Sequence, residues 1–230
     1  MVKWKKHDAK SFDSASCFHV VCFQPCQTDA EKFRFSDYCL IGTVIYLPVF
    51  LCVTVGLRRG EMLALRWDDI DFSNKLLKVR HNMVRGEKGY IIKAPGSEAG
   101  IRDIAIGDEV LDEPREARAQ YMMDAFTYST GFQNLGFVVR QADGSPYKPD
   151  SMTQKWARFL EESGLPKIRL HDLRHSNATV LIQAGVNPRV VQQRPGHSDV
   201  SITLNTYTHV LPEMDAAAAE KIDTILRKRA

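Results

Sequence analysis

The apolar residues of this chain recur mostly at helical spacing. That spacing covers residues 37–66, 109–126, 150–162 and 171–184, and a short segment that follows Asn187-Pro188. We expect the first helix to break near Gly56, and either Asp150 or Ser151 to cap the third. Further along, Ser198 or Asp199 can cap a helix that carries Tyr207, and a terminal helix is expected beyond Pro212.

Strand-like segments lie between the first two helices, at residues 76–81, 90–93 and 101–106. Turn-forming residues separate them at 85–89 and 95–100. Three such neighbours predict one small antiparallel sheet. The pattern as a whole therefore predicts an α+β fold that is mostly helical.

Composition adds little to this picture. The chain has 230 residues, 44% of them apolar and 26% charged, which is typical of a folded protein with a substantial core. Its net charge of +3 is too small to indicate nucleic acid. Residues 166–210 are modestly basic, which is compatible with a phosphate backbone. The charged residues there are Lys167, Arg169, Arg174, Arg189 and Arg194 against Asp172 and Asp199.

The cysteines and the longest apolar run bear on location. An odd number of cysteines and no secretory signal favour free thiols in a reducing compartment. The five are Cys17, Cys22, Cys26, Cys39 and Cys52. The first three, with His19, lack a clean CxxC pair, so no metal site is predicted. The apolar run at 43–56 is too short to cross a bilayer. We therefore predict a cytoplasmic protein without membrane association.

The segment from His171 to His209 holds the candidate chemistry. His171 and Arg174 are three residues apart on a predicted helix, so both can face one ligand, and a guanidinium suits a phosphate. Tyr207 can act as a nucleophile if nearby cations or a base favour its phenolate, because its unperturbed pKa is about 10. Taken singly, an HxxR pair is more often a surface ion pair and a tyrosine more often a packing residue. Their combination with His197 is more specific.

Three segments carry a resemblance to the catalytic domain of tyrosine recombinases, the phage integrase family. They are TVGLRRGEMLALRWDDID with Arg58 and Glu61, HDLRH from His171, and PGHSDVSITLNTYTH with His197 and Tyr207. Arg58 and Glu61 are also three residues apart, so the carboxylate can orient or neutralise the arginine.

The resemblance implies a role for each matching residue. Arg58 and Arg174 would hold the scissile phosphate, His171 would assist proton transfer, His197 would hydrogen-bond a phosphate oxygen, and Tyr207 would attack. The implied reaction is site-specific DNA recombination by transesterification through a 3′-phosphotyrosine, without a metal or other cofactor. The implied partners are double-stranded DNA and further copies of the chain, as a tetramer on DNA.

The resemblance also implies a domain division. Residues 36–230 are expected to form the catalytic domain, and residues 1–35 an unassigned leader. Family members usually carry a separate core-binding domain before the catalytic one, and we expect none here.

Two positions depart from the family pattern. Similar chains carry a lysine at the place of Gly96 in the segment Pro95 to Arg102, and this lysine is implied to protonate the leaving 5′ hydroxyl. Lys93 is a tentative replacement, and the alternative that it is a solvated charge at a strand end stays open. Pro195 stands where leucine is usual and fixes φ beside Gly196 and His197.

Two alternatives to an active recombinase remain. One is a catalytically impaired DNA-binding remnant of an integrase, which the departures at Gly96 and Pro195 and the expected lack of a core-binding domain favour. The other is a metalloenzyme that uses His171, His175, His197 and His209, although this reading leaves the arginines and Tyr207 unexplained.

Overall fold

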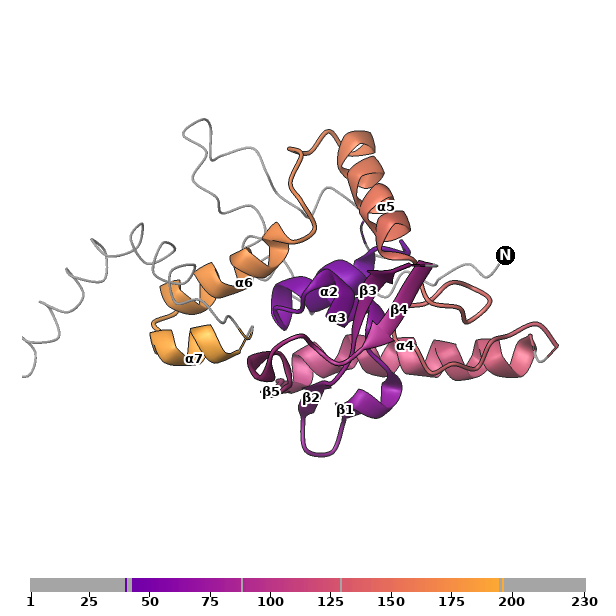
Figure 1. The fold of residues 1–230 in the computed structure, drawn as a ribbon, viewed down its shortest axis with the longest axis horizontal. Helices are drawn as coiled ribbons and strands as arrows, with labels where there is room; N and C mark the ends of the chain where they lie inside the picture. Colours follow the sequence, from indigo (N-terminus) through magenta and orange to yellow (C-terminus); the bar gives the residue numbers. More distant parts are fainter. Residues whose placement is uncertain (1–39, 41–42, 88, 129, 195, 197–230) are drawn as a thin grey trace, which may run out of the picture.

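A computed structural model describes residues 40, 43–87, 89–128, 130–194 and 196 (Figure 1). Helices and short strands follow one another in an α+β arrangement, as predicted. The helices are α2 (Tyr46–Thr54), α3 (Arg59–Ala64), α4 (Asp108–Thr127), α5 (Pro149–Glu162), α6 (Asp172–Gln183) and α7 (Pro188–Gln193), with short 3-10 turns η2 (Trp67–Asp69) and η3 (Glu98–Gly100). The strands are β1 (Ile70–Asp71), β2 (Leu76–Val79), β3 (Asn82–Gly86), β4 (Gly89–Lys93) and β5 (Arg102–Ala105).

The core forms where α2, α3, α5 and the start of α6 meet. The break between α2 and α3 falls at Gly56, as predicted, and this residue has a φ of 79° that suits glycine. The turn allows both helices to bury apolar residues in one cluster. Among its most deeply buried members are Leu51, Leu57, Met62, Met152, Trp156 and Leu173.

Helix α6 is tied to α2 by a buried polar contact as well as by packing. The side-chain amide of Asn177 donates to the carbonyl oxygens of Val53 and Thr54, at 2.7 and 3.0 Å. These carbonyls lie in the last turn of α2, where a helix leaves carbonyls without intrahelical partners. Asn177 satisfies them and fixes the position of α6 relative to the α2–α3 turn.

The strands form two separate units rather than the single sheet that was predicted. β1, β2 and β5 form an antiparallel sheet in which Leu77 pairs with Ile104. β4 pairs instead with β3 in a hairpin, with Met83 opposite Ile92. The sequence prediction missed β3 because it is NMVRG, which is poor in β-formers and buries only Met83. Part of it was assigned to the turn at 85–89.

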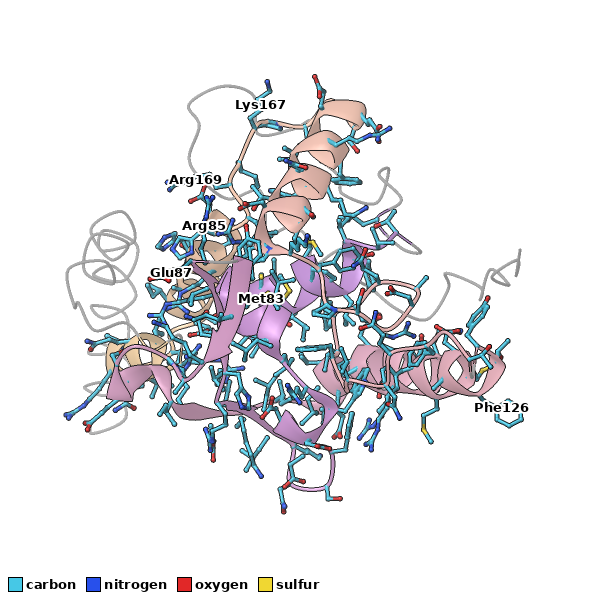
Figure 2. All side chains as sticks on the ribbon, turned by 45° about the vertical axis from the view of Figure 1, so that its right-hand side comes forward. Met83, Arg85, Glu87, Phe126, Lys167 and Arg169 are labelled. Carbon is cyan, nitrogen blue, oxygen red and sulfur yellow. The ribbon has the colours of Figure 1, made fainter. Side chains whose placement is uncertain are left out.

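The hairpin and α4 both reach the surface of the molecule near the core. β3 packs against α3, and Met83 points inward while Arg85 and Glu87 lie toward the outer end of the hairpin (Figure 2). α4 extends away from the body to Phe126, which is 88% exposed (Figure 2).

Most predicted helix limits agree with the structure, with one correction. Lys148, rather than Asp150 or Ser151, occupies the N-cap of α5, because Pro149 suits the first helical position. Asn187 caps α7 as predicted, and its side chain accepts a hydrogen bond from the Arg189 backbone at 2.9 Å. No helix in the described part of the chain is long and apolar enough to cross a membrane.

Candidate phosphate-binding site

Three arginines from different parts of the chain converge on one buried carboxylate. Arg58 precedes α3, Arg102 begins β5 and Arg174 lies on α6, while Glu61 is in the first turn of α3. We call these four residues the Glu61 cluster. The Glu61 side chain is only 2% exposed, so its charge depends on the surrounding guanidinium groups.

Arg58 is held by Glu61 through both its backbone and its side chain. Its backbone N–H donates to Glu61 Oε2 at 2.9 Å, and its Nη1 donates to Glu61 Oε1 at 2.8 Å. Its Nη2 donates to the carbonyl oxygen of Gly196 at 2.6 Å. The side chain of Arg58 remains 33% exposed, which leaves part of the guanidinium accessible to a ligand. The predicted i, i+3 contact between Arg58 and Glu61 is confirmed.

Arg102 makes a bidentate pair with the same carboxylate. Its Nη1 and Nη2 donate to Glu61 Oε1 and Oε2, at 3.1 and 2.9 Å. The side chain is 8% exposed. Sequence reasoning missed Arg102 as a member of the site, although it ends the segment from Pro95 to Arg102 that was compared with the family pattern because of Gly96.

Arg174 is the most deeply buried of the three arginines. The residue is 1% exposed. Its Nη1 atom donates to the carbonyl oxygen of Gly56 at 3.0 Å, and the same Nη1 atom lies 3.9 Å from Glu61 Oε2. Burial, and then the charge of Arg58, lower the pKa of Arg174 to about 9, while Glu61 opposes the shift. The guanidinium is therefore charged at neutral pH and would gain from an anion.

The Glu61 cluster carries an excess of positive charge. Burial acts to raise the pKa of Glu61, but the hydrogen bonds and charge of Arg102, with the hydrogen bonds of Arg58, leave this pKa below its usual value. One ionised carboxylate thus faces three guanidinium groups. The adjacent Cys52 thiol adds no negative charge, because burial raises its pKa to about 12. An oxyanion such as a phosphate would complete the charge balance.

His171 lies at the N-cap of α6, at the surface, while Arg174 points into the core from the next turn. The imidazole ring of His171 contacts that of His175 edge to face, with the ring centroids 5.1 Å apart. Desolvation, and then the charges of His175 and Arg174, lower the pKa of His171. Its imidazole is therefore neutral at pH 7 and able to accept a proton.

The tentative residue Lys93 lies at the end of β4 and is exposed. It pairs in register with Asn82, whose side-chain oxygen would lie 2.1 Å from a Cβ placed on Gly60 in α3. The end of β4 is thus close to the first turn of α3, which Arg58 precedes. A Cβ placed on Gly96 would meet no atom within 4 Å, so a lysine would fit there.

The described residues cover only part of the predicted site. Arg58 and Arg174 are brought together on Glu61. His197, Tyr207 and Pro195 lie outside the described residues, as do His209, residues 1–35 and the cysteines other than Cys52. In the part of the chain that is described, no three His, Cys, Asp or Glu side chains are grouped as a metal site.

The fold and the Glu61 cluster together define a mostly helical α+β domain with a cation-rich centre suited to an oxyanion. A family model described as the phage integrase family matches residues 27–214, and the chain belongs to that family. The resemblance and the fold class drawn from the sequence are thereby confirmed.

Individual relatives support this assignment. The chain is similar to the ICEBs1 integrase of Bacillus subtilis (strain 168), with 30% identity over 196 residues that make up 81% of this chain and 50% of the relative. It is also similar to the transposase from transposon Tn916 of Enterococcus faecalis, with 30% identity over 76% of this chain and 44% of the relative. The chain thus spans about half the length of these relatives.

Solved structures show the same fold. The Tn1549 transposon integrase (residues 82–397, Y379F), determined in complex with transposon right end DNA, matches with a TM-score of 0.67 and 25% identity. The match covers 82% of this chain and 62% of the solved chain. XerA recombinase has the same fold, with a TM-score of 0.62 at 18% identity over 90% of this chain and 64% of that chain.

Proposed function

We propose that this chain breaks and rejoins double-stranded DNA in site-specific recombination, by transesterification through Tyr207. In this proposal Arg58 and Arg174 hold the scissile phosphate, His171 takes part in proton transfer and His197 donates a hydrogen bond to a phosphate oxygen. Recombinases, integrases and transposases among the similar proteins support the reaction class. Residues 36–230 would form the catalytic domain.

The observation that carries the proposal is the excess positive charge of the Glu61 cluster. Phosphoryl transfer requires positioning and charge stabilisation on the non-bridging oxygens, and fixed guanidinium groups supply both. Arg58 is partly exposed, and its guanidinium donates one hydrogen bond to Glu61 and one to the carbonyl oxygen of Gly196, so its orientation is set before a ligand arrives. Such preorganisation avoids the cost of ordering the side chain during the reaction.

The reaction forms one phosphate ester for each one that it breaks. The Tyr207 oxygen attacks phosphorus and loses its proton, the bond from phosphorus to the 5′ oxygen breaks, and that oxygen takes up a proton. A 3′-phosphotyrosine results. A free 5′ hydroxyl of another strand then attacks the same phosphorus, and the tyrosine leaves. The neutral imidazole of His171 suits it to the proton transfers.

The partners follow from the same reaction. The Tn1549 transposon integrase was solved with DNA, which supports double-stranded DNA as the partner of this chain. Exchange between two DNA sites needs two strand breaks at each site, and each break uses the tyrosine of one chain. We therefore propose that four chains, as a tetramer on DNA, form the active assembly.

The proton donor to the 5′ oxygen is the open part of the mechanism. We propose Lys93 for this role, because β4 ends near the first turn of α3 and the side chain is exposed. Gly96 has room for a lysine, so Gly96→Lys offers a test of a second position. Loss of a general acid costs about a hundred- to ten-thousand-fold in rate.

Covalent trapping on nicked duplex DNA tests the proposal. The substrates come from the flanks of the gene, and protein-DNA adducts are separated on a denaturing gel. We expect an adduct with the wild-type chain, none with Tyr207→Phe, and slower formation with Lys93→Ala. Gly96→Lys should restore the rate in the Lys93→Ala background.

The other outcomes discriminate the alternative. An adduct only in Gly96→Lys would identify an integrase that has lost its general acid. No adduct in any variant, together with salt-dependent DNA binding, would contradict the proposal and support a DNA-binding remnant. An adduct that persists in Tyr207→Phe would contradict Tyr207 as the nucleophile.

A further inference from the structure

Arg102 connects two parts of the site that are far apart in the sequence. On one side it pairs with both oxygens of Glu61, the carboxylate that also holds Arg58. On the other side its Nε donates to the carbonyl oxygen of Arg194 at 2.8 Å. One planar guanidinium thus binds a carboxylate and a backbone carbonyl in fixed relative positions.

The backbone around Arg194 and Gly196 is held closely by the same region. Arg194 Nη1 donates to the carbonyl oxygen of Ala105 at 2.9 Å, and Arg58 Nη2 donates to that of Gly196 at 2.6 Å. A Cβ on Gly196 would lie 2.5 Å from the Ala99 carbonyl oxygen and 3.2 Å from Arg102 Cδ and Nη1, and its φ is 70°. Only glycine fits this close approach without strain. Gly196 immediately precedes His197 in the sequence.

We propose that Arg102 is a positioning residue for the phosphate-binding site: through Glu61 it orients Arg58, and through the Arg194 carbonyl it fixes the backbone that Arg58 also contacts at Gly196. The inference rests on the proposed function, since the oriented Arg58 is the proposed phosphate ligand. Arg102 itself is 8% exposed, with its donors directed at protein oxygens, so it is not a catalytic residue.

Loss of Arg102 would change Arg58 in two ways. Glu61 would lose its bidentate partner while remaining buried, so its carboxylate would draw more strongly on Arg58 and leave less positive charge for a phosphate. The carbonyl of Arg194 would lose its hydrogen bond from Arg102, close to the contact that Arg58 makes with Gly196. Small displacements of this kind typically cost about a hundred-fold in rate.

The experiment measures single-turnover cleavage of the nicked duplex together with non-covalent DNA affinity. We expect Arg102→Met to lower the cleavage rate by about a hundred-fold and the affinity far less, since other contacts to the backbone remain. Arg102→Lys keeps the charge but loses the bidentate geometry. Its cleavage rate should lie between that of the wild type and that of Arg102→Met. The matched control is Arg140→Met, which removes an arginine that is 11% exposed and paired with Asp124 at 2.6 Å, away from the Glu61 cluster.

A double-mutant cycle with Glu61→Gln separates positioning from general stability. If Arg102 acts through Glu61, Arg102→Met should reduce the rate much less in the Glu61→Gln background than in the wild type. Thermal unfolding of each variant is followed in parallel. Additive losses of rate, or an equal loss in Arg140→Met, would assign Arg102 a purely structural role and overturn the proposal.

A readout without DNA keeps this proposal distinct from the proposed function. The guanidinium signals of Arg58 in ¹⁵N NMR spectra of the full chain should shift in Arg102→Met and stay in place in Arg140→Met. If the wild-type chain forms no adduct, the recombinase proposal fails, while this NMR comparison still decides whether Arg102 orients Arg58. Unchanged Arg58 signals in Arg102→Met would overturn the inference.

Discussion

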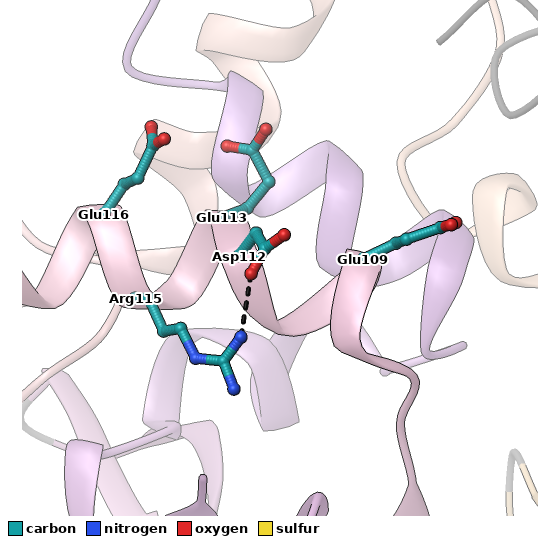
Figure 3. A pocket seen from close by; sticks show the side chains of 5 residues that line it. All are labelled: Glu109, Asp112, Glu113, Arg115 and Glu116. Atoms are coloured by element: carbon teal, nitrogen blue, oxygen red, sulfur yellow. Dashed lines mark hydrogen bonds and ion pairs between the residues drawn. The ribbon is translucent and has the colours of Figure 1, made fainter. Parts of the chain in front are cut away.

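The Glu61 cluster and the acidic face of α4 have net charges of opposite sign, and they differ in how their residues are brought together. The first surrounds one carboxylate with three arginines. The second consists of four acidic residues and one arginine, drawn in Figure 3. They line a surface hollow of about 310 Å³. The residues of the acidic face are Glu109, Asp112, Glu113, Arg115 and Glu116.

The difference lies in where the charges come from. The acidic face belongs to a single helix. In its ion pair between Arg115 and Asp112, the two side chains are 44% and 53% exposed. Water screens such charges and leaves their side chains mobile. The Glu61 cluster draws on separate segments, and its carboxylate is 2% exposed. Convergence from several elements is what desolvates the charges and fixes their directions, and so makes a binding site out of ion pairs.

The largest effect in this comparison should come from Glu61→Gln. The change leaves three guanidinium groups without a counter-charge, two of them buried, so the free energy of unfolding at pH 7 should fall by about 3–5 kcal/mol. Because the pKa of Glu61 is lowered in the folded protein, its carboxylate contributes stability above its usual pKa, and that stability is lost as the pH falls through the folded-state pKa. Urea unfolding of the wild type and of Glu61→Gln, from pH 7 to pH 3.5, measures the loss of free energy and its dependence on pH. A difference in the free energy of unfolding that stays constant over this range would contradict the lowered pKa of Glu61.

A smaller effect of opposite sign is expected from Glu113→Gln. Burial raises the pKa of Glu113 and outweighs the hydrogen bond from the Tyr46 hydroxyl at 2.7 Å. The folded protein then binds this proton more tightly than the unfolded chain, so the ionised carboxylate costs stability above the folded-state pKa. Glu113→Gln should therefore raise the urea midpoint at neutral pH and lose this advantage in acid. A lower midpoint at pH 7 would show that the charge of Glu113 is stabilising.

The smallest effect should follow Arg115→Gln. Its bond to Asp112 at 2.8 Å links adjacent turns at the surface, and such pairs contribute below about 1 kcal/mol. We expect a change of that size at low salt and none at high salt, measured by the same urea titration. A loss comparable to that of Glu61→Gln would break the proposed distinction between the two regions.

Local signals in the sequence determined much of the architecture. The helical spacing predicted α4, α5 and α6 close to their observed limits, and Gly56 and Asn187-Pro188 marked a break and a cap that the structure confirms. These features depend on residues within a few positions of each other, so periodicity and capping chemistry suffice to find them. The family resemblance rested on equally local segments.

Tertiary structure alone decided the strand pairing and the composition of the Glu61 cluster. β4 pairs with β3, which has a weak local signal, because the hairpin can bury Met83 against α3. Arg102 joins Glu61 across 41 residues and Arg194 across 92. No spacing rule links residues so far apart, since their contact depends on how α3, β5 and α6 pack. The sequence by itself determined which local elements form and which family the chain resembles; packing determined which charges meet in the core, because only there does desolvation make their mutual contacts decisive.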